Sequence, residues 1–190
     1  MTPRWAYALS ESMLSEPLPR RWAHSLGVAR RARELRPILG DDAELMEAAA
    51  VLHDVGYSPS IAATGFHPLD GARFLRDQEN VPERVVRLVA HHSFALLEAE
   101  ERGLREELEA EFDLERPDLV DALVVCDMTT TPTGEHTTTP QRVDEIVSRY
   151  GPDTIVGRFI QRAATEIHAS ADRVCRRMAA AGEKLDTQPM

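Results

Sequence analysis

Residues 49–57 read AAVLHDVGY, and this stretch decides the fold class. The apolar positions that lead into it recur at helical spacing, so we predict a helix that begins after Asp41 or Asp42 and ends at His53. Asp54 follows directly. Two ionisable side chains therefore stand side by side at the end of an otherwise apolar helix.

The same helical spacing recurs on both sides of this stretch and predicts an all-α chain. Proline stands at several expected helix starts, where its missing N–H would be unpaired in any case. We predict helices over residues 19–39, 68–77, 82–92, 95–112, 118–127, 140–150 and 152–181. The Val-rich run 119–127 could instead be a buried strand, but no alternating segment exists to pair with it. We expect a single-domain helical bundle over residues 1–190.

The composition excludes several classes of protein. The 190 residues are 43% hydrophobic and 28% charged, which is typical of one globular domain. The formal net charge is −10 and Lys184 is the only lysine, so we expect no nucleic-acid partner. No apolar run reaches the roughly 20 residues of a membrane span, and the N-terminus lacks the apolar segment of a signal peptide. We expect a cytoplasmic protein with no membrane partner.

Four ionisable side chains lie on or just after apolar helix faces, namely His24, His53, Asp54 and Asp127. A buried charge without a partner is costly, so such groups pair with each other or bind a metal. Imidazole and carboxylate together suit Fe, Mn, Zn or Ni better than Ca or Mg. Taken singly, each has an ordinary structural role, such as a hydrogen-bonded core histidine. Their convergence from three predicted helices is what indicates a site.

The order of the motifs is more specific than any one of them. The chain reads RRWAHSLGVARRA at 20–32, AAVLHDVGY at 49–57, GFHPLDGARFL at 65–75, VRLVAHHS at 86–93 and ALVVCDM at 122–128. This series resembles the HD-domain superfamily of metal-dependent phosphohydrolases over roughly residues 24–127. The resemblance implies a helical bundle of the HD-domain type, with a metal-binding core at about 18–130 and C-terminal helices at about 140–182.

The resemblance also implies the ligands. The first metal ion would be held by four side chains, namely His24, His53, Asp54 and Asp127. His67 and the pair His91 and His92 look like the additional ligands of binuclear members, in which the aspartate that matches Asp54 bridges two ions. Helical spacing favours His92 as the inward-facing member of the pair, and His91 is a second ligand or a polar neighbour. We expect one or two divalent transition ions per chain, Fe or Mn first, with Ni, Zn or Co as alternatives.

The activity that the resemblance implies is hydrolysis of a phosphoester or phosphoanhydride by metal-activated water, with Asp54 and His53 as catalytic residues. The expected partner is a small phosphorylated substrate, a nucleotide or a related metabolite, and a homo-oligomer is compatible with the sequence. Many family members have a lysine where this chain has Tyr57, which puts the lysine's role in doubt. The alternative is a non-catalytic, metal-containing module that binds a nucleotide as a signal.

Two further features of the sequence allow two interpretations each. Arg20, Arg21 and Arg73 flank the motif segments and could bind phosphate, although exposed surface charge is the commoner role of arginine. The threonine-rich loop 129–139 must begin near the mouth of the site, because it follows Asp127 closely. Its side chains are either substrate contacts or part of a polar connector.

Overall fold

The computed structural model describes residues 2–185 and residue 187, and within them it consists of helices and loops without a β-strand. This confirms the all-α prediction, and the Val-rich run 119–127 lies inside a helix rather than in a strand. No helix among these residues is both long enough and apolar enough to cross a bilayer. The expected span 1–190 includes residues 1, 186 and 188–190, which lie outside the described residues.

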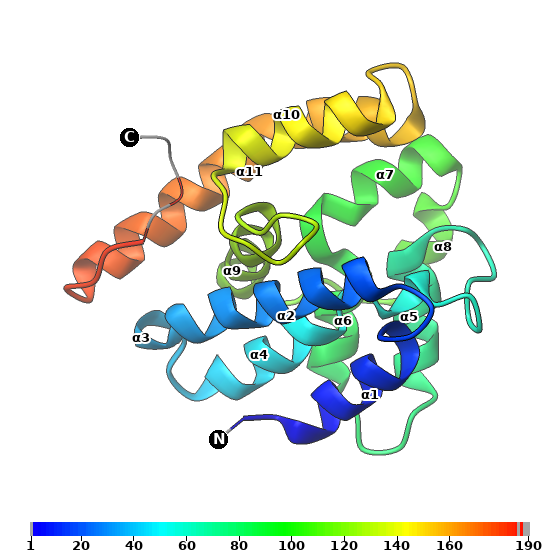
Figure 1. Ribbon diagram of the computed structural model, residues 1–190, viewed down its shortest axis with the longest axis horizontal. Helices are drawn as coiled ribbons and strands as arrows, with labels where there is room; N and C mark the ends of the chain where they lie inside the picture. Colours follow the sequence, from blue (N-terminus) through cyan, green and yellow to red (C-terminus); the bar gives the residue numbers. More distant parts are fainter. Residues whose placement is uncertain (1, 186, 188–190) are drawn as a thin grey trace.

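The helices follow one another with short connections. The first half contains α1 (Arg4–Leu14), α2 (Pro19–Glu34), α3 (Arg36–Leu39), η1 (Gly40–Asp42), α4 (Ala43–Leu52), η2 (Val55–Tyr57) and α5 (His67–Arg76). The second half contains α6 (Glu83–His91), η3 (His92–Phe94), α7 (Ala95–Arg102), α8 (Arg105–Glu111), α9 (Pro117–Met128), α10 (Thr139–Tyr150) and α11 (Ile155–Ala180). In Figure 1, α2 and α4 lie side by side, and α10 and α11 run together along the opposite side of the molecule.

The single helix predicted over 19–39 is interrupted. Helix α2 ends at Glu34, and a short new helix begins at Arg36. The cause is Pro37, which has no N–H to donate and whose ring would clash with the carbonyl group of Arg33 in a continuous helix. The prediction of one continuous helix was therefore wrong, although Pro37 in the sequence indicates the break.

Two other helices differ from the expectation. The segment 95–112 is two helices, because the chain turns at Gly103 with a φ of 71°, a conformation that glycine adopts without strain. Helix α1 was not predicted at all. It buries Ala6, Ser10 and Leu14, which recur every four residues, so the helical spacing was present in the sequence.

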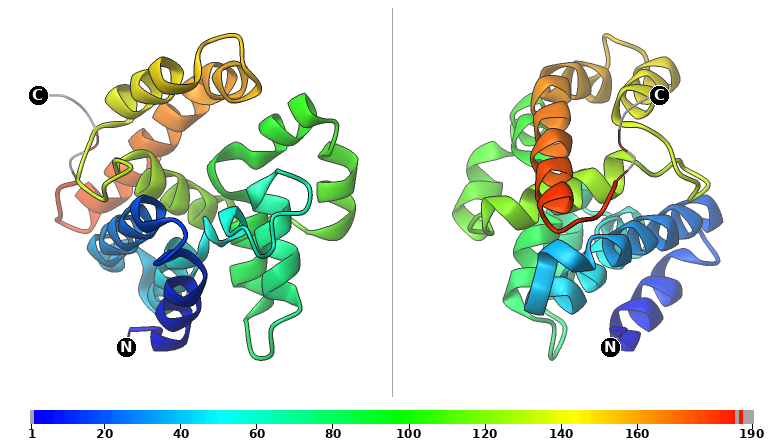
Figure 2. Two further views of the ribbon diagram at one scale, coloured as in Figure 1. Left: turned by 45° about the vertical axis from the view of Figure 1, so that its right-hand side comes forward. Right: turned by 90° about the vertical axis from the view of Figure 1, so that its left-hand side faces the viewer.

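Two hydrophobic clusters lie on different faces of α9. The larger is formed mainly by α1, α2, α4, α5, α6 and α9, with contributions from α7, α8 and the second half of α11, and Leu52 and Leu69 are among its fully buried members. The smaller joins the second face of α9 to the α10–α11 pair and contains Met128 and Phe159. Val120 packs against both clusters. The left view of Figure 2 shows the α10–α11 pair on one side of α9, and α11 bonds to the first half of α9 through Ser170 to Asp121 and Arg177 to the carbonyl group of Asp118.

The close approach of η2 to α5 allows a first prediction. A Cβ atom added at Gly56 would lie 2.0 Å from the carbonyl oxygen of His67 and 2.6 Å from the amide nitrogen of Gly71. These are backbone atoms that cannot rotate away, so Gly56→Ala must separate the two segments and should lower the free energy of unfolding by about 2–3 kcal/mol. Gly71→Ala is the matched comparison, since its nearest contact is 3.0 Å. Equal stabilities of the two variants in urea unfolding would contradict this packing.

Candidate metal centre

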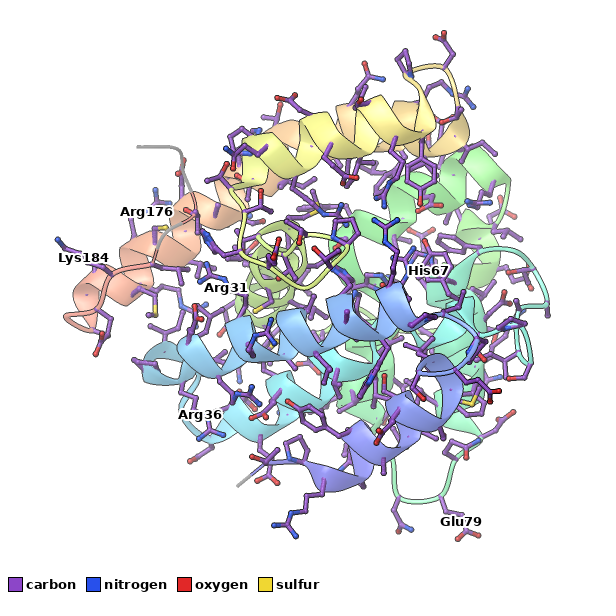
Figure 3. All side chains as sticks on the ribbon, in the orientation of Figure 1. Arg31, Arg36, His67, Glu79, Arg176 and Lys184 are labelled. Carbon is purple, nitrogen blue, oxygen red and sulfur yellow. The ribbon has the colours of Figure 1, made fainter. Side chains whose placement is uncertain are left out.

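The structure brings six of the seven expected ligands together in two groups. The first group is His24, His53 and Asp127, and the second is Asp54, His67 and His92. Within each group the candidate ligand atoms lie within 4.8 Å of one another. Most of these residues stand at or near helix ends, where the chain changes direction: His67 begins α5, for example, and His53 caps α4. Figure 3 marks His67 on its helix.

Asp54 lies between the two groups. Its Oδ2 atom is 3.3 Å from Nε2 of His53 and 3.8 Å from Nε2 of His24, both in the first group. Its Oδ1 atom is 3.4 Å from Nε2 of His67, in the second group. One carboxylate therefore presents a separate oxygen to each group.

Three of the histidine rings are held by backbone carbonyl groups through Nδ1. The distances are 2.9 Å from His24 to Thr131, 2.8 Å from His53 to Ala50 and 2.7 Å from His92 to Val89. A carbonyl oxygen only accepts, so each Nδ1 donates, and a neutral ring keeps its lone pair on Nε2 for a metal. The buried Nε2 atom of His53 has no hydrogen-bond partner among the described residues. A metal ion would satisfy this atom, so the residues present fit such an ion.

The second group favours neutral imidazoles. The Nε2 atoms of His67 and His92 lie 3.0 Å apart. Burial and the charge of His92 hold the pKa of His67 well below its usual value. Burial and the charge of His53 lower the pKa of His92 to about 4. Both rings are therefore neutral near neutral pH, which is the form that binds a metal.

The carboxylates carry negative charge despite their burial. Burial alone would raise the pKa of Asp54, but the charges of Arg21 and His53 outweigh it and hold that pKa well below its usual value. At Asp127 burial is likewise outweighed, by the close contact of its Oδ1 atom with Nε2 of His24 and by the charge that His53 carries when it is protonated, so its pKa is lowered. For His53 itself, burial lowers the pKa, but the neighbouring carboxylate of Asp54 raises it overall. The centre thus combines anionic oxygen with imidazole nitrogen, a donor set suited to transition metals.

His91 is the expected ligand that the structure does not bring into either group. Helix α6 ends at His91, and the next residue, His92, has an extended backbone conformation. The two neighbouring rings therefore point in different directions. The Nε2 atom of His91 donates to the carbonyl oxygen of Phe112 at 2.7 Å, away from the candidate ligands. His91 is a buried neighbour, and His92 is the member of the pair that faces the centre.

Arg21 provides a fixed positive charge beside Tyr57. Its Nη1 atom donates to Oδ2 of Asp54 at 2.8 Å, and its guanidinium group lies 3.9 Å from the ring centre of Tyr57. The Tyr57 ring in turn stacks on His67, with ring centres 3.9 Å apart. Arg21 therefore faces the candidate ligands. The half-buried Arg73 instead pairs with glutamates of α8, and Arg20 is exposed.

The segments next to the ligands position them. Ser93 donates a hydrogen bond to Oδ2 of Asp127 and has a φ of 50°, which places it in the sparsely populated left-handed region. The threonine-rich loop supplies the Thr131 carbonyl group that holds His24. Glu135 and His136 of the same loop are exposed. The loop therefore contacts the centre mainly through its backbone.

A pocket opens onto the two groups. This inner pocket has a volume of about 200 Å³ and is bounded on one side by Asp54, His67, His92 and Asp127. Its lining also includes apolar side chains of α10 and α11, namely Ile146, Val156, Phe159 and Ile160, and charged side chains, among them Glu98 and Arg102 of α7. An outer pocket of about 370 Å³ reaches His24 from the side of Pro17 and Pro132. The two pockets share three arginines, Arg21, Arg142 and Arg149.

The family model of the HD domain matches residues 21–128, more than half of the chain. This chain belongs to the HD-domain family. The HD-domain superfamily consists of metal-dependent phosphohydrolases, and all six grouped side chains lie inside the matched residues.

One curated protein is similar to part of this HD-domain chain. Ribonuclease Y from Rubrobacter xylanophilus is 39% identical over 70 residues, which cover 37% of this chain and 14% of that protein. The chain thus spans only a small part of that relative's length. No solved structure was found to match the chain.

Sequence reasoning missed two residues of the HD centre. Ser93 follows the histidine pair in the stretch VAHHS, but nothing in that stretch indicates a bond to Asp127. Arg142 lies beyond the matched residues, in a helix whose pattern of Val143 and Ile146 indicates only packing. Neither role can be read from local spacing, because each depends on a residue from another helix.

Proposed function

We propose that this HD-domain protein hydrolyses a phosphoester or phosphoanhydride of a nucleotide or a related small metabolite. The observation that carries the proposal is the position of Asp54, which presents one oxygen to each of two groups of metal-ligand type. His24, His53 and Asp127 would hold one ion, and His67 and His92 the other, with Asp54 shared. Divalent ions, of which Fe and Mn are the first candidates, would lower the pKa of a bound water molecule and polarise a phosphoryl oxygen.

The chain's own side chains support this reaction in defined ways. The ionised carboxylate of Asp54 can accept a hydrogen bond from a water molecule and orient it. Arg21 holds that carboxylate in place through the 2.8 Å contact. Ser93 holds Asp127 on the opposite side of the centre. The apolar helices over the inner pocket limit the access of bulk water, which strengthens electrostatic interactions within it.

A small substrate fits this centre better than a long polyanion. The relative's name refers to ribonuclease activity, but the matched residues are a small part of that protein. In this chain α10 and α11 cover the inner pocket, and the net charge is −10. An extended RNA strand would meet a mostly acidic surface, which disfavours its binding.

The test is an assay of purified protein with Mn²⁺ or Fe²⁺. The panel should contain nucleoside mono-, di- and triphosphates, dinucleoside polyphosphates, p-nitrophenyl phosphate and a single-stranded RNA. We expect phosphate or nucleotide release from a small compound, and loss of that release on adding a chelator. Cleavage of RNA alone would contradict the small-substrate proposal. Tight nucleotide binding without turnover would support the non-catalytic module instead, which Tyr57 in place of the family's lysine favours.

A further inference from the structure

Arg142 is a buried cation that the family motif does not include. It lies in α10, beyond the matched residues 21–128, and its side chain is 6% exposed. The Nη1 atom pairs with the carboxylate of Glu145. The Nε atom is buried and has no hydrogen-bond partner in the part of the chain that the structure describes. Because a buried N–H without a partner is costly, this atom is poised for an acceptor that is not part of the fold.

The surroundings of Arg142 indicate where that acceptor would lie. Arg142 lines both the inner and the outer pocket, and its charge contributes to lowering the pKa of Asp127. The guanidinium group is therefore within electrostatic reach of the candidate metal ligands. An arginine can offer two parallel N–H groups to a phosphate, which makes it a stronger and more specific partner than a single point charge.

The charge around the shared mouth of the two pockets is positive, in contrast to the chain as a whole. Arg21, Arg142 and Arg149 all line both pockets. Glu145 pairs with both Arg142 and Arg149, and Asp54 pairs with Arg21, so two carboxylates offset part of the charge of the three arginines. In a chain with a net charge of −10, this concentration of arginine favours an anion at one place.

The wall opposite the candidate ligands has a different chemistry. It is formed by apolar side chains of α9, α10 and α11, namely Met128, Ile146, Val156, Phe159 and Ile160, with the ring of Tyr150 at its edge. Such a wall stabilises a flat or branched organic group by burying it. The aliphatic side chains and the Phe159 ring of this wall offer no hydrogen bond to the hydroxyl groups of a small polar alcohol.

We propose that Arg142 binds the phosphate of the substrate and that the α10–α11 wall takes an apolar ring in its leaving group. The substrate class is then an organic phosphate with a ring, such as a mononucleotide or an aryl phosphate, rather than a phosphate of a small polyol. The inference rests on the proposed phosphohydrolase function, and it assigns substrate selection to helices outside the HD-domain match.

The test compares Arg142→Met with wild type in two measurements. The first is binding of inorganic phosphate to the metal-loaded protein by calorimetry, which requires no turnover. The second is hydrolysis of p-nitrophenyl phosphate and glycerol phosphate. Loss of a charge-assisted hydrogen bond should weaken phosphate binding about tenfold or more and raise KM for the aryl ester to a similar degree. Metal content per chain should not change. Arg158→Gln is the matched control, because Arg158 is exposed and pairs with Glu101 away from the pockets.

A second variant tests the apolar wall. Phe159→Leu keeps an apolar side chain but removes the ring, and it should raise KM for p-nitrophenyl phosphate about threefold or more while leaving phosphate binding unchanged. Wild type should have a lower KM for the aryl ester than for glycerol phosphate, a comparison that does not depend on the better leaving group of the aryl ester. If glycerol phosphate has the lower KM, or if Phe159→Leu raises KM for both esters equally, the assignment of the wall is wrong.

The outcomes separate this inference from the proposed function. Equal phosphate affinity in Arg142→Met, Arg158→Gln and wild type would overturn the role of Arg142 even if the protein hydrolyses esters well. Weaker phosphate binding in Arg142→Met alone would support that role even if no ester were hydrolysed. If Arg142→Met does not fold, Arg142→Lys retains the charge and loses the paired N–H groups. Its phosphate affinity should then fall severalfold, and an unchanged affinity would overturn the proposal.

Discussion

Asp54→Asn should remove hydrolytic activity, lowering kcat/KM by at least about a thousandfold, or ~4 kcal/mol of barrier. The amide has nearly the same size as the carboxylate, but it carries no charge and keeps only one acceptor oxygen. It can no longer present an oxygen to each group, as Asp54 does toward His53 and His67. The number of metal ions bound per chain should also fall in this variant, as measured by elemental analysis of the purified protein.

Asp121→Asn is the control for this experiment. Asp121 stands on α9, as Asp127 does, and it accepts hydrogen bonds from Ser170 and Arg173 on α11. The substitution therefore removes a paired carboxylate from the same helix without touching the candidate ligands. We expect Asp121→Asn to lose some thermal stability while keeping its metal and most of its kcat/KM. Activity above about a tenth of wild type in Asp54→Asn would contradict a shared carboxylate at the centre.

The second large effect concerns the number of metal ions that each chain binds. His67→Gln should lower the metal content from about two ions per chain to about one, because His67 and His92 supply the nitrogen atoms of the second group. Loss of a direct ligand should weaken binding by more than the roughly 10- to 100-fold that outer hydrogen-bond partners contribute. Activity should fall with the second ion, because Asp54 would then contact an ion on one side only.

His91→Gln is the matched variant, since His91 and His67 are both expected ligands by sequence. The His91 ring donates to the Phe112 carbonyl group, and a glutamine amide can donate there as well. We expect unchanged metal content in His91→Gln, with at most a modest loss of stability. Equal metal losses in the two variants, or one ion per wild-type chain, would contradict the division into two groups.

Much of the helical framework could be predicted because helix formation depends on local spacing. The spacing of the apolar residues before His53 predicted the helix that the structure shows as α4. The two errors in helix continuity also had local causes, at Pro37 and at Gly103. Both residues are visible in the sequence, and each is a known interruption of a helix. These features needed no knowledge of how the helices pack.

The histidine pair shows where local spacing reaches its limit. Helical periodicity favoured His92 over His91, and the structure agrees. The decisive cause is nevertheless the end of α6 at His91, after which the backbone becomes extended. Helical periodicity predicted which ring faces the centre, and the change in backbone direction is the reason that the other ring points away.

The helical class, the HD-domain family and the residue types that can hold a metal follow from the sequence alone, because each depends on local spacing and side-chain chemistry. The packing of the helices was needed to show that Asp54 stands between two groups, that Arg21 donates a hydrogen bond to it, and that Arg142 lines the same pocket from α10. Arg21 and Arg142 are far apart along the chain. Their meeting depends on how α10 and α11 pack against α9, and no local pattern records that packing.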